Sequence, residues 1–299
     1  MIRVKNLGFT YPGAAHSAVN EISFTVHPGE IFGFLGPSGS GKSTTQKIVI
    51  GLLKGYTGRA EVLGKEVSAW GSAYYDRIGV SFELPNHYQK LTARENLAFF
   101  AALYGRPTLD PLQLLEQVGL ADDANTTVAA FSKGMQMRLN LARALLHEPE
   151  VLFLDEPTTG LDPVNARRVK ELALDLRRRG RTVFLTTHDM HVADDLCDQV
   201  AFLVDGRIQA MDTPRTLKLA YGAAAVRVEY REAGVQRSVE YPLTGLGEQQ
   251  EFLRLLQSGT VETIHSREAS LEEVFVRVTG RSLSEDGAAP GAKRQAVGA

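Results

Sequence analysis

Three short apolar runs divide the first two thirds of the chain, at residues 31–35, 151–154 and 183–187. Segments with helical patterns separate them. Apolar runs of this length are typical of strands that are buried on both faces of a parallel sheet. Ligands of such sheets bind beyond the carboxyl ends of the strands. We therefore expect the polar residues that follow the three runs to meet at one edge.

Helical periodicity marks the residues from about 91 to 147, between the first two of these runs. Thr92 and Glu95 match the S/T-x-x-E capping box that begins many helices, and apolar residues follow them. The pattern predicts a helical insertion between two strands of the sheet.

The pattern changes again after about Tyr221, and residues 221–280 predict a small α+β domain. The predicted elements are, in order, strands near 226–230 and 239–241, a helix over 248–256, a strand over 261–265 and a last helix that begins at Ser270. Ser270 and Glu273 form a second capping box. The glycine, alanine and proline content of residues 281–299 predicts a disordered tail.

Composition narrows the class of protein. The chain has 299 residues, of which 43% are hydrophobic and 23% are charged, as in ordinary globular proteins. The formal net charge of −2 gives no bulk attraction to nucleic acid, and we expect no nucleic-acid partner. The single cysteine, Cys197, excludes an internal disulfide and fits a reducing compartment. No apolar stretch approaches the roughly 20 residues that cross a bilayer, so we expect any membrane role to come through a partner.

The first run leads into a glycine-rich segment, residues 36–43, that fits the phosphate-binding loop pattern G-x-x-x-x-G-K-[ST]. Its glycines let several backbone N–H groups point at one anion, and the following helix adds the positive end of its dipole. Lys42 can bring a full charge to the outer phosphates, and Ser43 can offer a hydroxyl to Mg²⁺. We therefore predict that the chain binds a nucleoside triphosphate. The predicted binding residues are Gly36, Pro37, Ser38, Gly39, Ser40, Gly41, Lys42, Ser43 and Thr44.

The second run ends in two adjacent carboxylates, Asp155 and Glu156. A carboxylate at this place can hold Mg²⁺, usually through water, across the metal from Ser43. Glu156 can orient the water that attacks the γ-phosphate and accept its proton. The sequence Pro-Thr-Thr-Gly-Leu-Asp at 157–162 follows directly and makes a chance pair of acids in a turn the weaker interpretation.

These motifs resemble, in kind and in order, the ATP-binding cassette (ABC) ATPase family over about residues 1–215. Besides the phosphate loop, the resemblance rests on Leu-Asp-Glu-Pro at 154–157, on Gly-Leu-Asp at 160–162 and on His188, which follows the third run. Phe-Ser-Lys-Gly-Met at 131–135 stands where that family carries its signature L-S-G-G-Q.

The resemblance implies an α/β phosphate-loop ATPase cassette over residues 1–220. Its expected parts are a central, mostly parallel sheet, an antiparallel β edge and a helical subdomain over about 91–147. The small C-terminal α+β domain, 221–280, would follow. The implied cofactors are ATP and Mg²⁺.

The resemblance also implies roles for single residues. Two cassettes are expected to pack head to tail, so that Ser132 and Gly134 bind the triphosphate held by the partner chain. Asp162 is then expected at the interface between the two cassettes. Tyr11 matches the aromatic residue that stacks on adenine, and His188 matches the histidine that contacts the γ-phosphate.

Some positions depart from the family pattern. Lys133 and Met135 lie in the signature, and Glu83 replaces the glutamine that the family presents to Mg²⁺ and to the attacking water. The Glu83 carboxylate can still offer an oxygen to the metal, but it adds a negative charge near the γ-phosphate. The implied catalytic residues are therefore Glu156, His188 and Glu83, and the implied metal-binding residues are Ser43, Glu83 and Asp155.

Residues 270–280, Glu83 and the signature at 131–135 resemble the daunorubicin-resistance and sodium-export branch of the family. This resemblance implies the ATP-hydrolysing subunit of an export system for drug-like or other small molecules. Its expected partners are a second ABC cassette, most simply a copy of this chain, and an integral membrane permease, which would place it at the cytoplasmic face of the membrane. A soluble ABC-type ATPase that clamps the ribosome or DNA is the alternative. Such proteins commonly carry two fused cassettes or a long coiled-coil insertion, and the sequence shows neither.

Overall fold

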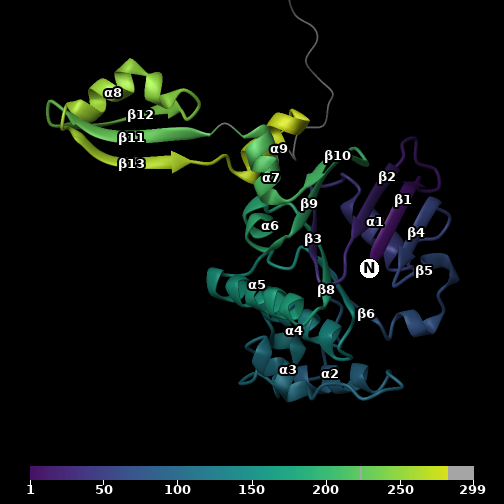
Figure 1. Ribbon diagram of the computed structural model, residues 1–299. Coiled ribbons are helices and arrows are strands. Elements are labelled where there is room, and N and C mark those ends of the chain that lie inside the picture. The colour runs from purple at the N-terminus through teal and green to yellow at the C-terminus, as the bar shows by residue number, and fades with distance from the viewer. Residues whose placement is uncertain (223, 282–299) are drawn as a thin grey trace, which may run out of the picture.

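A six-stranded sheet forms the centre of the computed structural model, which describes residues 1–222 and 224–281. In sheet order, its strands are β10 (Arg207–Asp212), β9 (Gln199–Val204), β3 (Ile31–Leu35), β8 (Thr182–Thr187), β7 (Val151–Asp155) and β6 (Ile78–Ser81). All neighbouring pairs are parallel except β9 and β10 at one edge (Figure 1). The three predicted runs are β3, β7 and β8, which lie side by side, so this prediction is confirmed.

Strand β3 shows why the central runs are apolar throughout. The rings of Phe32 and Phe34 belong to a core cluster on one face of the sheet, and the ring of Phe184 stacks on Phe32 with centroids 5.8 Å apart. Ile31 and Leu35 belong to a second core cluster on the other face. Because β3 is covered on both sides, each of its residues is buried.

A four-stranded antiparallel sheet covers the first of these faces. In sheet order, its strands are β2 (Val19–Val26), β1 (Ile2–Phe9), β4 (Thr57–Val62) and β5 (Lys65–Glu66). Phe24 stacks on Phe32 of the main sheet with ring centroids 5.4 Å apart. Helix α1 (Lys42–Val49) adds Ile48 and Val49 to the same core cluster. This sheet and β10 form the expected antiparallel part of the fold.

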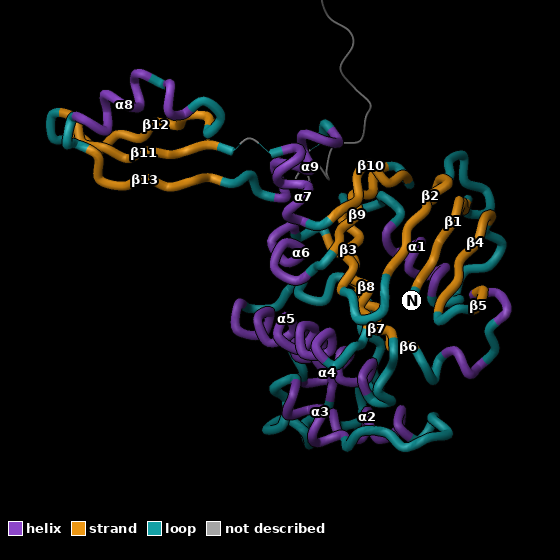
Figure 2. The backbone as a smooth tube through the Cα atoms, viewed as in Figure 1, coloured by secondary structure: helices purple, strands orange, loops and turns teal. Residues whose placement is uncertain are grey.

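Helices cover the opposite face and form the insertion between β6 and β7 (Figure 2). They are α2 (Ala93–Ala101), α3 (Pro111–Gln117), α4 (Lys133–Leu145), α5 (Pro163–Arg178), α6 (Met190–Leu196) and α7 (Pro214–Tyr221). Short 3₁₀ helices are η1 (Val67–Ala69), η2 (Ser72–Tyr74), η3 (Val128–Ala130) and η4 (Leu246–Glu248). The predicted capping box of α2 is present: Thr92 Oγ1 accepts the Glu95 N–H at 3.1 Å, and the Glu95 carboxylate accepts the Thr92 N–H at 2.8 Å. Among the described residues, no helix has the length and apolar character that crossing a bilayer requires.

A small sheet near the C-terminus has a core of its own. In sheet order, its strands are β12 (Val235–Pro242), β11 (Ala225–Glu232) and β13 (Val261–Arg267), and α8 (Gln250–Gln257) packs on one face. Val228 is fully buried there, and the rings of Tyr241 and Phe252 meet edge to face at 5.4 Å. Figure 1 shows this unit projecting away from the rest of the chain. Beyond Arg281, the expected disordered tail lies outside the described residues.

The last helix, α9 (Leu271–Thr279), does not join the small sheet, and this part of the prediction is wrong. It packs against α6, α7 and β10 of the main body. Phe275 is fully buried there, and its ring meets Phe202 of β9 edge to face at 5.3 Å. The capping box of Ser270 and Glu273 is present as predicted. The sequence pattern identifies the apolar face of a helix but not the surface which that face covers.

The placement of α9 gives a stability prediction. Phe275→Ala leaves a cavity in the main core and should lower the free energy of unfolding of the main body by about 3–5 kcal/mol. Denaturant titration followed by the fluorescence of Trp70, the single tryptophan of the chain, reports on this part of the molecule. Phe252→Ala removes the same side chain from the small core and should leave that transition in place. Equal shifts in both variants would contradict the assignment of α9.

Candidate nucleotide site

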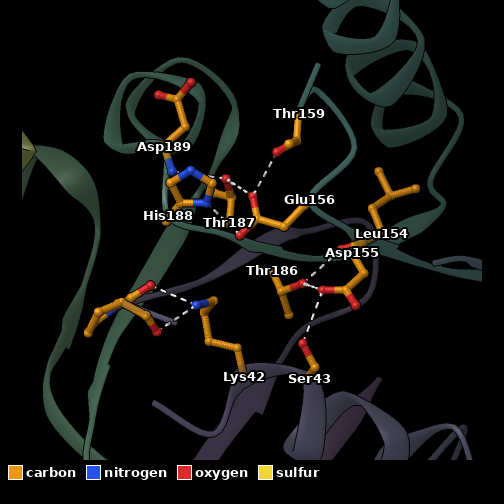
Figure 3. A network of polar contacts seen from close by, with 12 residues as sticks. Lys42, Ser43, Leu154, Asp155, Glu156, Thr159, Thr186, Thr187, His188 and Asp189 are labelled. Atoms are coloured by element: carbon orange, nitrogen blue, oxygen red, sulfur yellow. Dashed lines mark hydrogen bonds and ion pairs between the residues drawn. The ribbon is translucent and has the colours of Figure 1, made fainter. Parts of the chain in front are cut away.

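The carboxyl ends of β3, β8 and β7 bring the predicted polar residues to one edge of the main sheet. Strand β3 continues into the loop 36–41, after which α1 begins at Lys42. Strand β7 ends at Asp155 with Glu156 next, and β8 is followed by His188. Figure 3 shows the start of α1 facing the two carboxylates and the histidine.

The glycine loop has a backbone that other residues cannot easily adopt. Gly41 has φ 106°, and a Cβ atom at this position would lie 2.4 Å from the carbonyl oxygen of Ala18. Lys42 is only 8% exposed, and its ammonium donates hydrogen bonds to the carbonyl oxygens of Gly36, at 2.6 Å, and Pro37, at 2.9 Å. A full positive charge therefore lies within the loop, as the binding of phosphate would require.

Asp155 is buried and accepts two hydrogen bonds. Its Oδ1 accepts hydrogen bonds from the hydroxyl of Ser43, at 3.4 Å, and from the hydroxyl of Thr186. Burial is the main cause that raises the pKa of the Asp155 carboxyl above its ordinary value, and the neighbouring Glu156 raises it further. The hydrogen bond from Thr186 opposes this shift. A cation beside Asp155 would stabilise its ionised form.

Ser43 and Asp155 fit a magnesium ion that is shared with a nucleotide. Both offer oxygen atoms, which Mg²⁺ prefers, and Mg²⁺ usually combines one or two carboxylates with phosphate oxygens and water. Over residues 1–222 and 224–281, no group of three or more His, Cys, Asp or Glu side chains is placed to hold a metal. The role of Ser43 and Asp155 toward Mg²⁺ stays a prediction.

Glu156 is held in one orientation by hydrogen bonds on both carboxylate oxygens. Oε2 accepts from the hydroxyls of Thr187, at 3.0 Å, and Thr159, at 3.3 Å. Oε1 lies 2.9 Å from Nδ1 of His188, whose side chain is 55% exposed. The φ of Glu156 is 48°, a strained value for a residue with a side chain, and such strain is common at functional sites. The structure thus joins the predicted base and the predicted γ-phosphate contact in one pair.

The sequence motifs do not identify the threonines that position the two carboxylates. Thr186 and Thr187 are fully buried, and Thr159 lies in the turn after β7. A signal existed, because two hydroxyl residues end the otherwise apolar run of β8. Their partners depend on the register of β8 beside β7, in which Asp155 pairs with Thr186.

Tyr11 lies beside the start of α1. Its hydroxyl is 3.2 Å from Oγ1 of Thr44, and its ring meets Phe9 edge to face at 4.9 Å. The side chain is 38% exposed. An exposed aromatic ring next to the phosphate loop is suitably placed to stack on a base, and this role stays a prediction.

Glu83 lies at the same sheet edge without contacting the other predicted residues. It follows β6, whose Ser81 pairs with Leu154 of β7, so the chain leaves the sheet next to the acidic pair. Glu83 itself is exposed, and among the described residues its side chain makes no hydrogen bond or ion pair. Its role toward the metal and the attacking water stays a prediction.

The signature residues lie at the start of α4, beside another motif of the same chain. Ser132 caps α4 by accepting the N–H of Met135 at 3.2 Å. A Cβ atom on Gly134 would lie 3.3 Å from Leu161, so this glycine packs against the turn that precedes α5. Asp162 caps α5, and its backbone hydrogen bonds lower the pKa of its carboxyl. The predicted roles of Ser132, Gly134 and Asp162 between two cassettes stay predictions.

The glycine loop and the acidic pair lie on neighbouring elements of one parallel sheet and define a phosphate-loop nucleoside triphosphatase. The family profile described as ABC transporter matches residues 19–159. A second profile, described as fluoroquinolone efflux ABC transporter C-terminal domain, matches residues 224–268 and stops before α9. The chain is 61% identical over 285 residues to a fluoroquinolones export ATP-binding protein of Mycobacterium tuberculosis, with 95% of each chain covered. It therefore belongs to the ATP-binding subunits of ABC transporters, which are ATPases.

More distant relatives and solved structures agree with this assignment. The chain is 37% identical over 297 residues to Nod factor export ATP-binding protein I of Sinorhizobium fredii, with 89% of this chain and 83% of that one covered. A dimeric ATP-binding cassette in a post-hydrolysis state, bound to ADP and Pi, superposes with a TM-score of 0.66 at 28% identity. The match covers 71% of this chain and 98% of that one. An ATP-binding subunit of an ABC transporter gives a TM-score of 0.67 at 29% identity, over 74% and 93% of the two chains.

Because Asp155 is buried, we expect its ionised carboxylate to lower the stability of the nucleotide-free chain, although metal binding needs this carboxylate. An acid whose pKa is raised by folding stabilises the fold below its unfolded pKa, and this stability is lost as the pH rises through the folded pKa. Asp155→Asn should therefore raise the Tm of the nucleotide-free chain at pH 7 by about 2–4 °C. Differential scanning calorimetry at pH 4 should show a smaller difference.

The same variant should lose its response to the metal. Mg²⁺ added to saturating ATP should raise the Tm of the wild type further and that of Asp155→Asn little. Asp122→Asn, which neutralises an exposed carboxylate, is the matched control and should change neither value. A normal response to Mg²⁺ in Asp155→Asn would contradict the assignment of this residue.

Proposed function

We propose that this chain hydrolyses MgATP, as one of two cassettes packed head to tail, to drive the export of fluoroquinolone-like drugs through a separate membrane permease. The observation that carries the proposal is the pair formed by Glu156 and His188 beside Asp155. A carboxylate fixed by three neighbours at the open edge of the sheet suits a general base.

Within one chain, different residues bind the triphosphate, hold the metal and activate water. The loop 36–41 and Lys42 bind the triphosphate through backbone N–H groups and a fixed charge. Ser43 and Asp155 hold the metal, and Mg²⁺, when bound, neutralises charge on the β- and γ-phosphates. Glu156 orients the attacking water and takes its proton. His188, held by Glu156, is placed to contact the γ-phosphate.

A second copy of the chain supplies the rest of the site. The N-terminus of α4 presents backbone N–H groups and the positive end of the helix dipole, which suit an anion. Ser132 caps α4, and Gly134 packs against Leu161 of its own chain. Their proposed target is the nucleotide that a partner chain holds. The dimeric cassette of known structure, bound to ADP and Pi, supports this pairing. A homodimer needs no other subunit to complete both sites.

Export of a drug is supported by the relatives. The protein of Mycobacterium tuberculosis that is 61% identical is named for the export of fluoroquinolones, and residues 224–268 match a C-terminal domain named for fluoroquinolone efflux. Coverage of 95% of both chains means that the resemblance includes the small C-terminal unit. An ATP-binding subunit of such a system works at the cytoplasmic face of the membrane, where ATP is present.

The first test separates binding from hydrolysis. Glu156→Gln keeps the shape of the side chain and removes the base, so kcat for ATP hydrolysis should fall by about 10²–10⁴-fold. Binding of a fluorescent ATP analogue should persist, and the pairing of two chains, followed by size-exclusion chromatography with MgATP, should increase. Glu171→Gln, on the exposed face of α5, is the matched control. Normal turnover in Glu156→Gln would remove Glu156 from this role.

The second test concerns the permease. Affinity purification of the tagged chain from detergent-solubilised membranes should recover a polytopic membrane protein. In proteoliposomes, a fluoroquinolone should raise the ATPase rate of this complex, and the Glu156→Gln complex should show no such increase. Recovery of ribosomes or DNA, with ATPase activity that depends on RNA or DNA, would instead support the clamp.

A further inference from the structure

One face of α4 is fastened to the segment that connects β6 to α2. Gln136, Asn140 and Arg143 recur at intervals of four and three residues, so they lie along one side of the helix. Asn140 and Arg143 bond to residues 81–87 through their side chains, and Gln136 does so through its backbone carbonyl oxygen. This segment contains Glu83.

Asn140 is the most buried of the three contacts. Its side chain is fully buried, and Nδ2 donates hydrogen bonds to Oγ of Ser81, at 3.1 Å, and to the carbonyl oxygen of Phe82, at 2.8 Å. Its Oδ1 accepts a hydrogen bond from Arg143 at 2.6 Å. Both ends of the amide therefore have partners, and the side chain has one orientation. The carbonyl that it holds belongs to the residue directly before Glu83.

Two further contacts extend the attachment. Arg143 donates to the carbonyl oxygen of Asn86 at 2.7 Å, and its guanidinium lies 4.7 Å from the centre of the Phe100 ring. Nε2 of His87 lies 2.9 Å from the carbonyl oxygen of Gln136, so Nε2 is the donor. Burial lowers the pKa of His87 to about 4, and the imidazole stays neutral at physiological pH. The segment is thus fixed to α4 at both of its ends.

We propose that Asn140 is a positioning residue for ATP hydrolysis, because it fixes the backbone from which Glu83 reaches the metal and the attacking water. The inference rests on the proposed function of Glu83 and of the paired cassettes. Helix α4 begins after Ser132, which serves the nucleotide of the partner chain. Asn140 therefore ties a residue of one nucleotide site to the helix that completes the other, so that binding at one site aligns Glu83 at its neighbour.

The experiment measures steady-state hydrolysis by the full chain against ATP and Mg²⁺ concentration. Asn140→Ala should lower kcat by about tenfold, because it removes the buried hydrogen bond that holds the backbone next to Glu83. It should also raise the Mg²⁺ concentration for half-maximal activity. The Kd of a fluorescent ATP analogue should change by less than about twofold, because the phosphate loop is untouched. Ser81→Ala, which keeps the bond to Phe82, should lose less than about twofold in kcat.

Leu141→Ala controls for a loss of stability. Leu141 is buried on another side of α4, where it lines a narrow space with Val169 and Leu172 of α5. Its truncation should lower Tm at least as much as Asn140→Ala while kcat and the Mg²⁺ response stay normal. Equal kinetic effects in the two variants would overturn the inference.

A double-mutant cycle shows whether Asn140 acts through Glu83. Glu83→Ala combined with Asn140→Ala should turn over no more slowly than Glu83→Ala alone. Losses that multiply, or a normal kcat in either single variant, would overturn the inference. A wild-type chain without ATPase activity would instead refute the proposed function, so the two failures are distinguishable.

Discussion

The burial of two neighbouring carboxylates at the end of one strand is the constraint on which the rest of the site depends. Asp155 and Glu156 are 8% and 7% exposed, and like charges so close together repel strongly out of water. The order β3-β8-β7 offsets this by placing β8 directly beside the acids. Thr186 bonds to Asp155 and Thr187 to Glu156, so two consecutive residues of one strand support two consecutive residues of the next.

The turn after β7 connects this acidic pair to the signature within a few residues. Thr159 bonds to Glu156, the side chain of Lys133 lies against Gly160, and Gly134 packs on Leu161. These contacts join Glu156 to the start of α4 through a short stretch of backbone. The contacts of Asn140 carry the same helix to the segment of Glu83. Helix α4 thus contacts both the turn after β7 and the segment that contains Glu83.

Local sequence patterns correctly predicted those parts of the fold that depend on neighbouring residues in the chain. The apolar runs predicted β3, β7 and β8, and the capping boxes at Thr92 and Ser270 marked true helix starts. The predicted packing of α9 against the small sheet was wrong, because the apolar face of this helix would suit either the main core or the small core. The supporting threonines were missed because their partners follow from strand register across distant segments. The roles of Glu83 and Asp162 require a nucleotide and a second chain, which the fold of one chain does not contain.

The positive φ of Glu156 has a consequence for laboratory evolution of this enzyme. The backbone at this position suits glycine, so the glutamate lowers the stability of the nucleotide-free chain through backbone strain. At Glu156, thermal stability and catalytic turnover therefore favour different residues. Selection for thermal tolerance alone will therefore enrich variants that have lost Glu156 and that bind ATP without hydrolysing it. Selection that also requires transport will keep the glutamate.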